Sequence, residues 1–242
     1  MTERAPLLAN RARGIGVKAN ELAFFGKIAA SVTHELRNVL AVINESNGLM
    51  ADYLAMMREA PFPHREKFQR SVQKIEEQVR RGVEITSRFN RFAHSMDHAC
   101  ADIDLNSILT QTVSLAQRLA ALRNVELKGQ VCDHPIMLFT NAFRTQMALT
   151  RAIEAFIGSM SGSGSILMLA RDDLGSPCLD VYFGGESCEK IVKEAVAKFD
   201  EWQEFEELAS SLGMRYNWQA SDADFVLFFP GGQTPERTVP SK

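Results

Sequence analysis

The feature that most constrains the fold is an apolar repeat over residues 68–96. Apolar or small residues recur there in alternating steps of four and three, at Phe68, Val72, Ile75, Val79, Gly82, Thr86, Phe89, Ala93 and Met96. Such steps keep one face of a helix against a partner helix, which is typical of a coiled-coil seam. The repeat therefore predicts a long helix that packs against other helices and does not rest on a sheet.

A similar stripe precedes this repeat, formed by Leu22, Phe25, Ile28, Val32, Leu36, Val39 and Ile43. Its spacing of three and four predicts an amphipathic helix that runs to about Arg58. The segment 60–63 reads Ala-Pro-Phe-Pro, and two prolines forbid further helix. Two long helices joined by a short turn form an antiparallel hairpin.

A hairpin of two helices cannot enclose a core, so its stripes need further cover. Two hairpins that pair as a four-helix bundle would bury both stripes, and we predict such a homodimer. In the alternative arrangement the stripes pack on the C-terminal half of the same chain.

The pattern changes near Cys100. A helix of about 18 residues begins at Asp104, and a second spans about 143–160; short strands are expected at 125–128, 136–139, 166–171, 178–183, around 216 and at 225–229. With a charged helix expected over 189–212, this order predicts an α+β sandwich, one sheet covered on one face by helices. The expected organisation is an N-terminal segment (1–16), the hairpin (17–99), the α+β domain (100–232) and a tail (233–242).

Composition excludes several classes of function. The net charge of −3 gives no reason to expect nucleic acid or an anionic membrane as a partner. No apolar run approaches the ~18 residues of a membrane span, and the polar start lacks the apolar core of a signal peptide. The four cysteines lack zinc spacing and suit free thiols in a reducing cytosol. We expect a cytoplasmic protein without a metal site.

One histidine stands out, in the middle of the first predicted helix. At 100° per residue, His34 lies about 160–200° from the stripe residues Val32, Leu36 and Ile43, so it points into solvent. In-line phosphoryl transfer needs such an exposed imidazole, because both the phosphorus and the partner must reach the ring nitrogen. Taken alone, a histidine on a polar helix face is far more often a solvated surface residue without a chemical role.

The neighbours of His34 have chemistry that suits transfer. Glu35 could accept the hydrogen on one ring nitrogen and leave the other with a free lone pair. Asn38, one turn on, shares the face of His34 and could orient a water or a partner's phosphate. Around it we expect a transient docking strip for a partner, made of Arg37, Ala41, Val42 and Glu45.

The stretch His34-Glu35-Leu36-Arg37-Asn38, within a long helix followed by a second seam helix, resembles the dimerisation and phosphoacceptor domain of sensor histidine kinases. The resemblance implies that His34 is phosphorylated, that Glu35 acts as base or orienter, and that Asn38 assists dephosphorylation. In that family a proline usually follows the asparagine. Here that residue is Val39, which removes a helix bend but no catalytic group.

The second half resembles the ATP-binding domain of the same family, with departures at each nucleotide position. The asparagine that would hold Mg²⁺ falls on Glu154, and the polar position a turn earlier on Thr150. The adenine-binding aspartate falls on Phe183, which offers no acceptor, and Gly185 belongs to the same glycine motif. The glycine-rich lid is absent, so backbone amides cannot wrap a triphosphate.

The resemblance therefore implies a histidine phosphotransferase that passes a phosphoryl group between His34 and the aspartates of response-regulator receiver domains, with no cofactor. One alternative is an active histidine kinase with a divergent site, which alone would need ATP and Mg²⁺. The other is a non-catalytic adaptor or inhibitor, which would not depend on His34.

Overall fold

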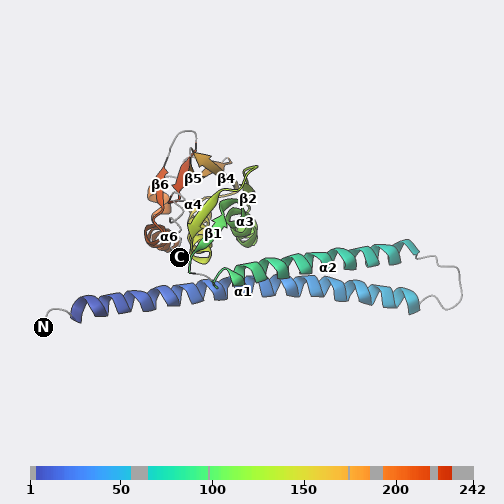
Figure 1. The fold of residues 1–242 in the computed structure, drawn as a ribbon. Coiled ribbons are helices and arrows are strands. Elements are labelled where there is room, and N and C mark those ends of the chain that lie inside the picture. Colours follow the sequence, from blue (N-terminus) through green and yellow to red (C-terminus); the bar gives the residue numbers. More distant parts are fainter. Residues whose placement is uncertain are drawn as a thin grey trace, which may run out of the picture. The chain divides into compact units, whose positions relative to one another are not determined.

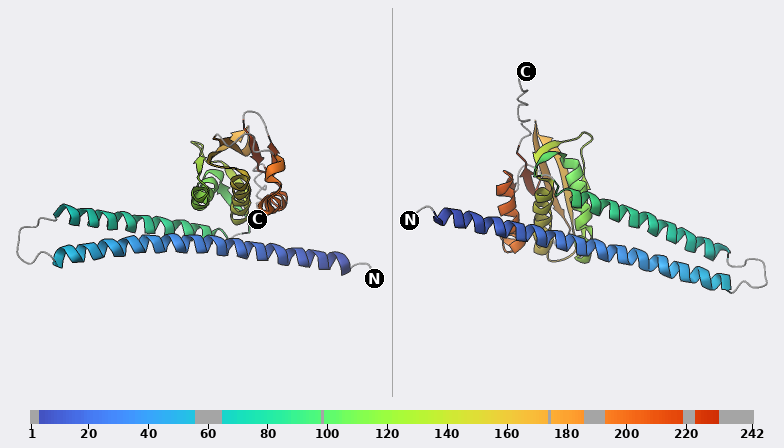
Figure 2. Two further views of the ribbon diagram at one scale, coloured as in Figure 1. Left: turned by 180° about the vertical axis from the view of Figure 1, so that it is seen from behind. Right: turned by 60° about the horizontal axis from the view of Figure 1, so that its bottom comes forward.

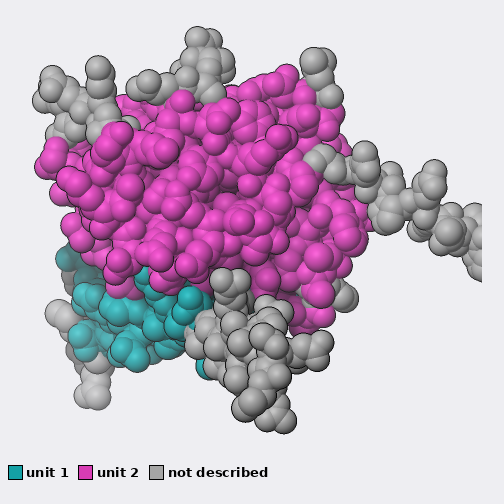
Figure 3. All heavy atoms as spheres, turned by 90° about the vertical axis from the view of Figure 1, so that its left-hand side faces the viewer, with its two compact units in different colours: residues 1–94 teal, residues 95–242 magenta. Residues whose placement is uncertain are grey.

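The computed structural model describes residues 4–55, 65–97, 99–173, 175–185, 193–218 and 223–230. The chain divides into two compact units, residues 1–94 and residues 95–242, which Figure 3 colours separately. The predicted turn at 60–63 and the predicted tail at 233–242 lie outside the described residues.

The first unit is an antiparallel pair of helices, α1 (Arg4–Ala55) and α2 (Arg65–His94) (Figure 1). Near one end, the rings of Phe24 and Phe92 meet edge to face with centroids 5.9 Å apart. Near the other, the Lys67 ammonium lies 5.9 Å from the centroid of the Tyr53 ring. The predicted hairpin is confirmed. Helix α1 begins earlier than expected and runs through most of the N-terminal segment 1–16.

The apolar stripes of the hairpin divide between two faces. One face is buried between α1 and α2 and includes Phe24, Ile28, Val32, Val39, Ile85 and Phe92. Leu22, which the stripe predicted to be covered, is instead 70% exposed. A single partner helix covers only part of a wide stripe, so the remaining apolar side chains face outward.

The second unit contains a mixed five-stranded sheet in the order β2-β4-β5-β7-β6 (Figure 1). Strand β2 (Val125–Gln130) runs parallel to β4 (Gly164–Asp173), and the other neighbours are antiparallel. The remaining strands are β5 (Ser176–Gly184), β6 (Arg215–Trp218) and β7 (Phe225–Phe228). Helices α3 (Leu105–Leu122), α4 (Ala142–Ser159) and α6 (Asp200–Ser211) lie together on one side of this sheet (Figure 2).

The core of this unit lies between the helices and one face of the sheet. Alternate strand residues enter it, such as Ile166 and Met168 of β4 and Leu179 and Val181 of β5. Capping fixes where the helices begin, because Asp104 accepts a hydrogen bond from the Asn106 amide at α3, and Asn141 accepts one from the Arg144 amide at α4. The predicted α+β domain is confirmed.

Two elements differ from the prediction. Strand β1 (Ala101–Asp104), which was not expected, pairs with β3 (Met137–Thr140) in a separate two-stranded sheet. The single helix expected over 189–212 is two helices within its described part, α5 (Lys193–Val196) and α6. The helix is interrupted between α5 and α6 because Phe199 packs on α4. A Cβ added at Gly158 of α4 would lie 2.8 Å from the Phe199 ring.

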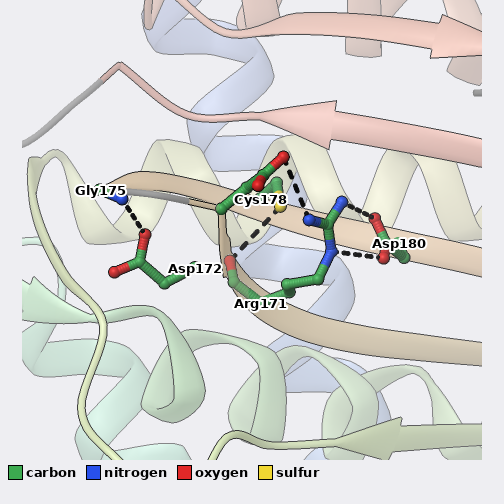
Figure 4. A network of polar contacts seen from close by, with 6 residues as sticks. Arg171, Asp172, Gly175, Cys178 and Asp180 are labelled. Atoms are coloured by element: carbon green, nitrogen blue, oxygen red, sulfur yellow. Dashed lines mark hydrogen bonds and ion pairs between the residues drawn. The ribbon is translucent and has the colours of Figure 1, made fainter.

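The sheet face opposite the helices carries a polar network in the β4–β5 hairpin (Figure 4). Arg171 holds the buried Asp180 through two hydrogen bonds, Nε to Oδ2 at 2.8 Å and Nη2 to Oδ1 at 3.2 Å. Its Nη1 lies 3.2 Å from Asp173 Oδ2. The hydrogen bond to Asp180 raises the pKa of the Arg171 guanidinium further above its ordinary value. The network ties the two strands together.

Candidate functional site

His34 lies on the exposed side of α1, as the helical angle predicted. Its neighbours at the same level, Val32 and Val39, are buried against α2 at 8% and 4% exposure. Arg37 and Asn38 are exposed beside His34, and Glu35 is half-buried. The imidazole is thus open to an approaching partner while the helix that carries it is anchored on its opposite side.

Asn38 contacts the His34 ring directly. Its side-chain nitrogen Nδ2 lies 3.3 Å from Nδ1 of His34, one helical turn away. From the sequence we expected Glu35 to contact a ring nitrogen of His34. In the structure, the side chain next to Nδ1 of His34 is that of Asn38.

The position of the hydrogen between Asn38 and Nδ1 determines which ring nitrogen of His34 can react as a nucleophile. An amide group can turn by 180°, so Asn38 either donates to Nδ1 or accepts a hydrogen bond from it, depending on the tautomer. When Asn38 accepts the Nδ1 hydrogen, Nε2 has its lone pair free and is the outward nucleophile. The arrangement therefore suits attack by Nε2 on a phosphorus atom brought by a partner.

The predicted docking strip surrounds this ring. Arg37, Ala41 and Glu45 are exposed, and Val42 is half-buried. Leu40, which was not predicted, is 64% exposed on the same stretch of helix. The strip thus combines small apolar and charged side chains.

In the second unit, the position expected to hold Mg²⁺ is occupied by an ion-pair cluster. Arg151 Nη1 donates to Glu154 Oε2 at 2.7 Å, and the two side chains are only 12% and 6% exposed. Arg151 Nε also lies 2.8 Å from Oε2 of Glu204 on α6, an ion pair without the angle of a hydrogen bond. The Glu154 carboxylate is therefore held by a guanidinium that also ties α4 to α6.

Aromatic rings pack around the position expected to bind adenine. Phe183 of β5 meets Phe156 of α4 edge to face, with ring centroids 5.0 Å apart. Phe156 in turn contacts Trp202 of α6 at 5.8 Å, Trp218 of β6 at 6.0 Å and Phe225 of β7 at 5.4 Å. These rings join the helices to the sheet through edge-to-face contacts, which favour a fixed packing.

The other two vestigial positions also have structural partners. The hydroxyl of Thr150 is buried and donates to the Gln146 carbonyl at 2.8 Å. Gly185 has φ +119°, and a Cβ there would lie 2.9 Å from the Gly164 Cα. A glycine is required at 185 by this close backbone approach, whether or not a nucleotide binds nearby.

Within the described part of the chain, the positions that the resemblance assigns to adenine and Mg²⁺ do not fit them. Phe183 offers a packed aromatic ring and no acceptor. Magnesium needs free oxygen ligands, but the Glu154 carboxylate is paired with Arg151. Sequence reasoning missed Arg151 and Glu204; the spacing of Arg151 and Glu154 was readable, whereas the pairing across to α6 was not.

No protein-family model and no curated protein matches the chain. Solved structures of histidine kinases resemble it. The catalytic domain of histidine kinase ThkA is 12% identical, covers 55% of this chain and 98% of its own, and has a TM-score of 0.44. ThkA in complex with the response regulator TrrA is 14% identical, with 90% and 65% covered and a TM-score of 0.42. A bacterial phosphotransferase is 15% identical, with 86% and 96% covered and a TM-score of 0.42.

Two findings bear on other kinds of site. Among the described residues, no helix is both long and apolar enough to cross a membrane. The same part of the chain contains no group of three His, Cys, Asp or Glu side chains placed to hold a metal ion.

Proposed function

We propose that the chain is a histidine phosphotransferase of a two-component phosphorelay. His34 receives a phosphoryl group from the phospho-aspartate of one receiver domain and passes it to the aspartate of another. The observation that carries the proposal is the exposed His34 imidazole with Asn38 3.3 Å from Nδ1. In the tautomer whose Nδ1 hydrogen Asn38 accepts, Nε2 is the nucleophile.

The second unit supports transfer without ATP. The aromatic packing of Phe183 and the ion pairs of Arg151 occupy the positions that the resemblance assigns to adenine and Mg²⁺. Without a nucleotide, the phosphoryl group on His34 has to come from another phosphorylated protein. Phospho-aspartate is a suitable donor because its acyl phosphate is a reactive mixed anhydride.

A homodimer is part of the proposal. The hairpin exposes apolar side chains on both helices, among them Leu22 and Leu40 of α1 and Val79 and Val83 of α2, each 49–70% exposed. Leu22 and Leu40 are five turns of 3.6 residues apart and therefore share one face. A second hairpin on this face would complete a four-helix bundle and cover these side chains.

The dimer is tested by sedimentation equilibrium. Leu40→Glu combined with Val83→Glu places charges on the proposed interface and should give a monomer, while Gln73→Glu, at an exposed polar position of α2, should remain a dimer. A wild-type chain that sediments as a monomer would refute this part of the proposal.

The receiver is proposed to dock on the strip of Arg37, Ala41, Val42 and Glu45 around His34, and the protein to work in the cytoplasm. Small apolar side chains mixed with charges suit a short-lived complex, because little apolar area has to be desolvated on each encounter.

Transfer is tested with purified receiver domains phosphorylated by radiolabelled acetyl phosphate. The wild-type chain should acquire label that is stable to base and labile to acid, as a phosphohistidine is. His34→Gln should acquire none, whereas His94→Gln, which alters an exposed histidine of α2, should label normally. No labelling of the wild type by any receiver would count against the proposal.

Calorimetry with Mg²⁺ and ATP at millimolar concentration separates the alternatives. Absence of binding leaves His34 dependent on a phosphorylated receiver. Binding, followed by labelling of His34 from ATP alone, would make the chain a kinase. Full activity of His34→Ala in a signalling assay would make it an adaptor.

A further inference from the structure

The loop between β2 and β3 holds a thiol against an imidazole. Cys132 Sγ lies 3.3 Å from Nδ1 and 3.7 Å from Nε2 of His134. Cys132 is half-buried and packs against the core of the second unit, while His134 is exposed. A nucleophile and a base within hydrogen-bond reach are the starting arrangement for thiol chemistry.

The fold itself builds this pair. The side chain of Asn106, at the start of α3, holds the loop at three points. Its Nδ2 donates to the carbonyls of Cys132 at 3.3 Å and His134 at 2.9 Å, and its Oδ1 accepts from the Cys132 amide at 3.0 Å. The loop is also fixed at Ile136, whose amide donates to Asp104 at 2.9 Å. Because 26 residues of chain separate Asn106 from Cys132, the pair depends on the tertiary fold.

We propose that Cys132 is a site of reversible modification by small-molecule disulfides, with His134 as its base. The class of ligand follows from access. Cys132 is half-buried in a loop that Asn106 holds in place, so a small disulfide reaches its thiol more readily than a protein surface does. This site lies outside the phosphoryl-transfer chemistry of His34 and does not depend on it.

The reaction is a thiol–disulfide exchange. The His134 imidazole accepts the proton of the Cys132 thiol, and the thiolate attacks one sulfur of the incoming disulfide. A new S–S bond forms on Cys132 as the old one breaks. The departing thiolate takes the proton from the His134 imidazolium and leaves as a small thiol. A second small thiol reverses the exchange.

The chain contains its own controls for reactivity. Cys100 is exposed, so it reports the reactivity of an accessible thiol without this loop. Cys178 is 0% exposed and should not react in the folded protein. If access alone governed the reaction, Cys100 would react faster than Cys132. If the imidazole governs it, the half-buried Cys132 should react faster than Cys100.

The experiment treats the folded full-length chain with oxidised glutathione at pH 7 and measures each mixed disulfide by peptide mass spectrometry. Cys132 should be modified faster than Cys100. His134→Gln should slow the modification of Cys132 by about tenfold, because it removes the base that accepts the proton of the attacking thiol. The same substitution should leave Cys100 unchanged, and the control His94→Gln should change neither site.

A second variant separates chemistry from access. Asn106→Ala loosens the loop but keeps both reacting side chains. If access limits the reaction, this variant should speed modification of Cys132, and His134→Gln should not slow it. Equal rates for Cys132 in the wild type and in His134→Gln, or a wild-type Cys132 slower than Cys100, would overturn the proposal. Circular dichroism checks that each variant is folded.

Discussion

Gly82 of α2 packs directly on Val39 of α1, so that a Cβ at position 82 would lie 3.4 Å from Val39 Cγ1. This contact lies one residue beyond Asn38. It sets how closely the two helices approach behind the candidate site.

The distance predicts opposite effects for small and large side chains at position 82. Gly82→Ala should raise stability by up to about 1 kcal/mol, because alanine favours the helix and its Cβ meets Val39 at an ordinary contact distance. Gly82→Leu should lower stability by about 1–3 kcal/mol, because its extra atoms overpack the interface. Thermal unfolding measures both. Gly48→Ala is the control, since nothing lies within 4 Å of the Cβ it would add. A stabilising Gly82→Leu would contradict this account of the contact.

Asn38 is predicted to position the His34 ring. Asn38→Leu should slow transfer from a phosphorylated receiver by about 2–10-fold, the value of one hydrogen bond. Asn38→Asp should transfer faster than Asn38→Leu, because a carboxylate still accepts the Nδ1 hydrogen. Single-turnover labelling measures the rates, and nitrogen NMR of the ring reports the tautomer. The control is Asn44→Leu, at an exposed asparagine of α1. A tautomer ratio that is the same in Asn38→Leu and the wild type would exclude the positioning role.

Arg151 is predicted to stabilise the second unit through its two carboxylates. Arg151→Leu should lower the free energy of unfolding by about 3 kcal/mol, because it removes the guanidinium that is paired with the buried Glu154. Denaturant unfolding measures the loss. In the matched control, Arg88→Leu removes an exposed ion pair with Glu84 and should change stability by no more than about 0.5 kcal/mol. If Arg151→Leu were as stable as the control, the cluster would not hold α4 to α6.

The buried Cys178 predicts a loss of stability in alkali. Burial raises the pKa of its thiol from 9.0 to about 11. The folded state therefore keeps a proton that the unfolded state loses, so stability is full below pH 9 and falls between pH 9 and 11, by about 3 kcal/mol at most. Burial also raises the pKa of the Tyr216 phenol, which adds a fall above pH 10. Cys178→Ala should remove only the loss of stability that begins near pH 9. Parallel pH profiles of the two proteins would show that Cys178 does not contribute.

The hairpin was readable from the sequence because its determinants are local. The stripes repeat within each helix, and the prolines at 61 and 63 end the first pattern. The exposure of His34 followed from the helical angle alone. The contact of Asn38 with the His34 ring was not predicted, because the sequence suggested Glu35 for that contact. Which apolar residues lie inside the hairpin was only partly readable, because Phe24, which the predicted stripe left out, is buried, whereas Leu22, which it included, is exposed.

The missed features all depend on contacts between distant residues. Strand β1 has four residues and only becomes a strand by pairing with β3, more than thirty residues later. The interruption of the helix before α6 contains no glycine or proline from which it could be predicted. It arises because Phe199 packs on Gly158. The ion pair between Arg151 and Glu204 joins α4 to α6. The periodicity of apolar residues within each helix does not show which helices lie close together in the fold.

The five-stranded sheet ends at β2, whose second edge is not paired within the sheet. An open edge is a template on which another chain can add a strand, and such additions lead to aggregation. Strand β2 carries Glu126 and Lys128 side by side, 2.7 Å apart and more than 60% exposed. A foreign strand would have to desolvate both charges to pair there. These two charges therefore protect the β2 edge against the addition of a strand from a second copy of the chain.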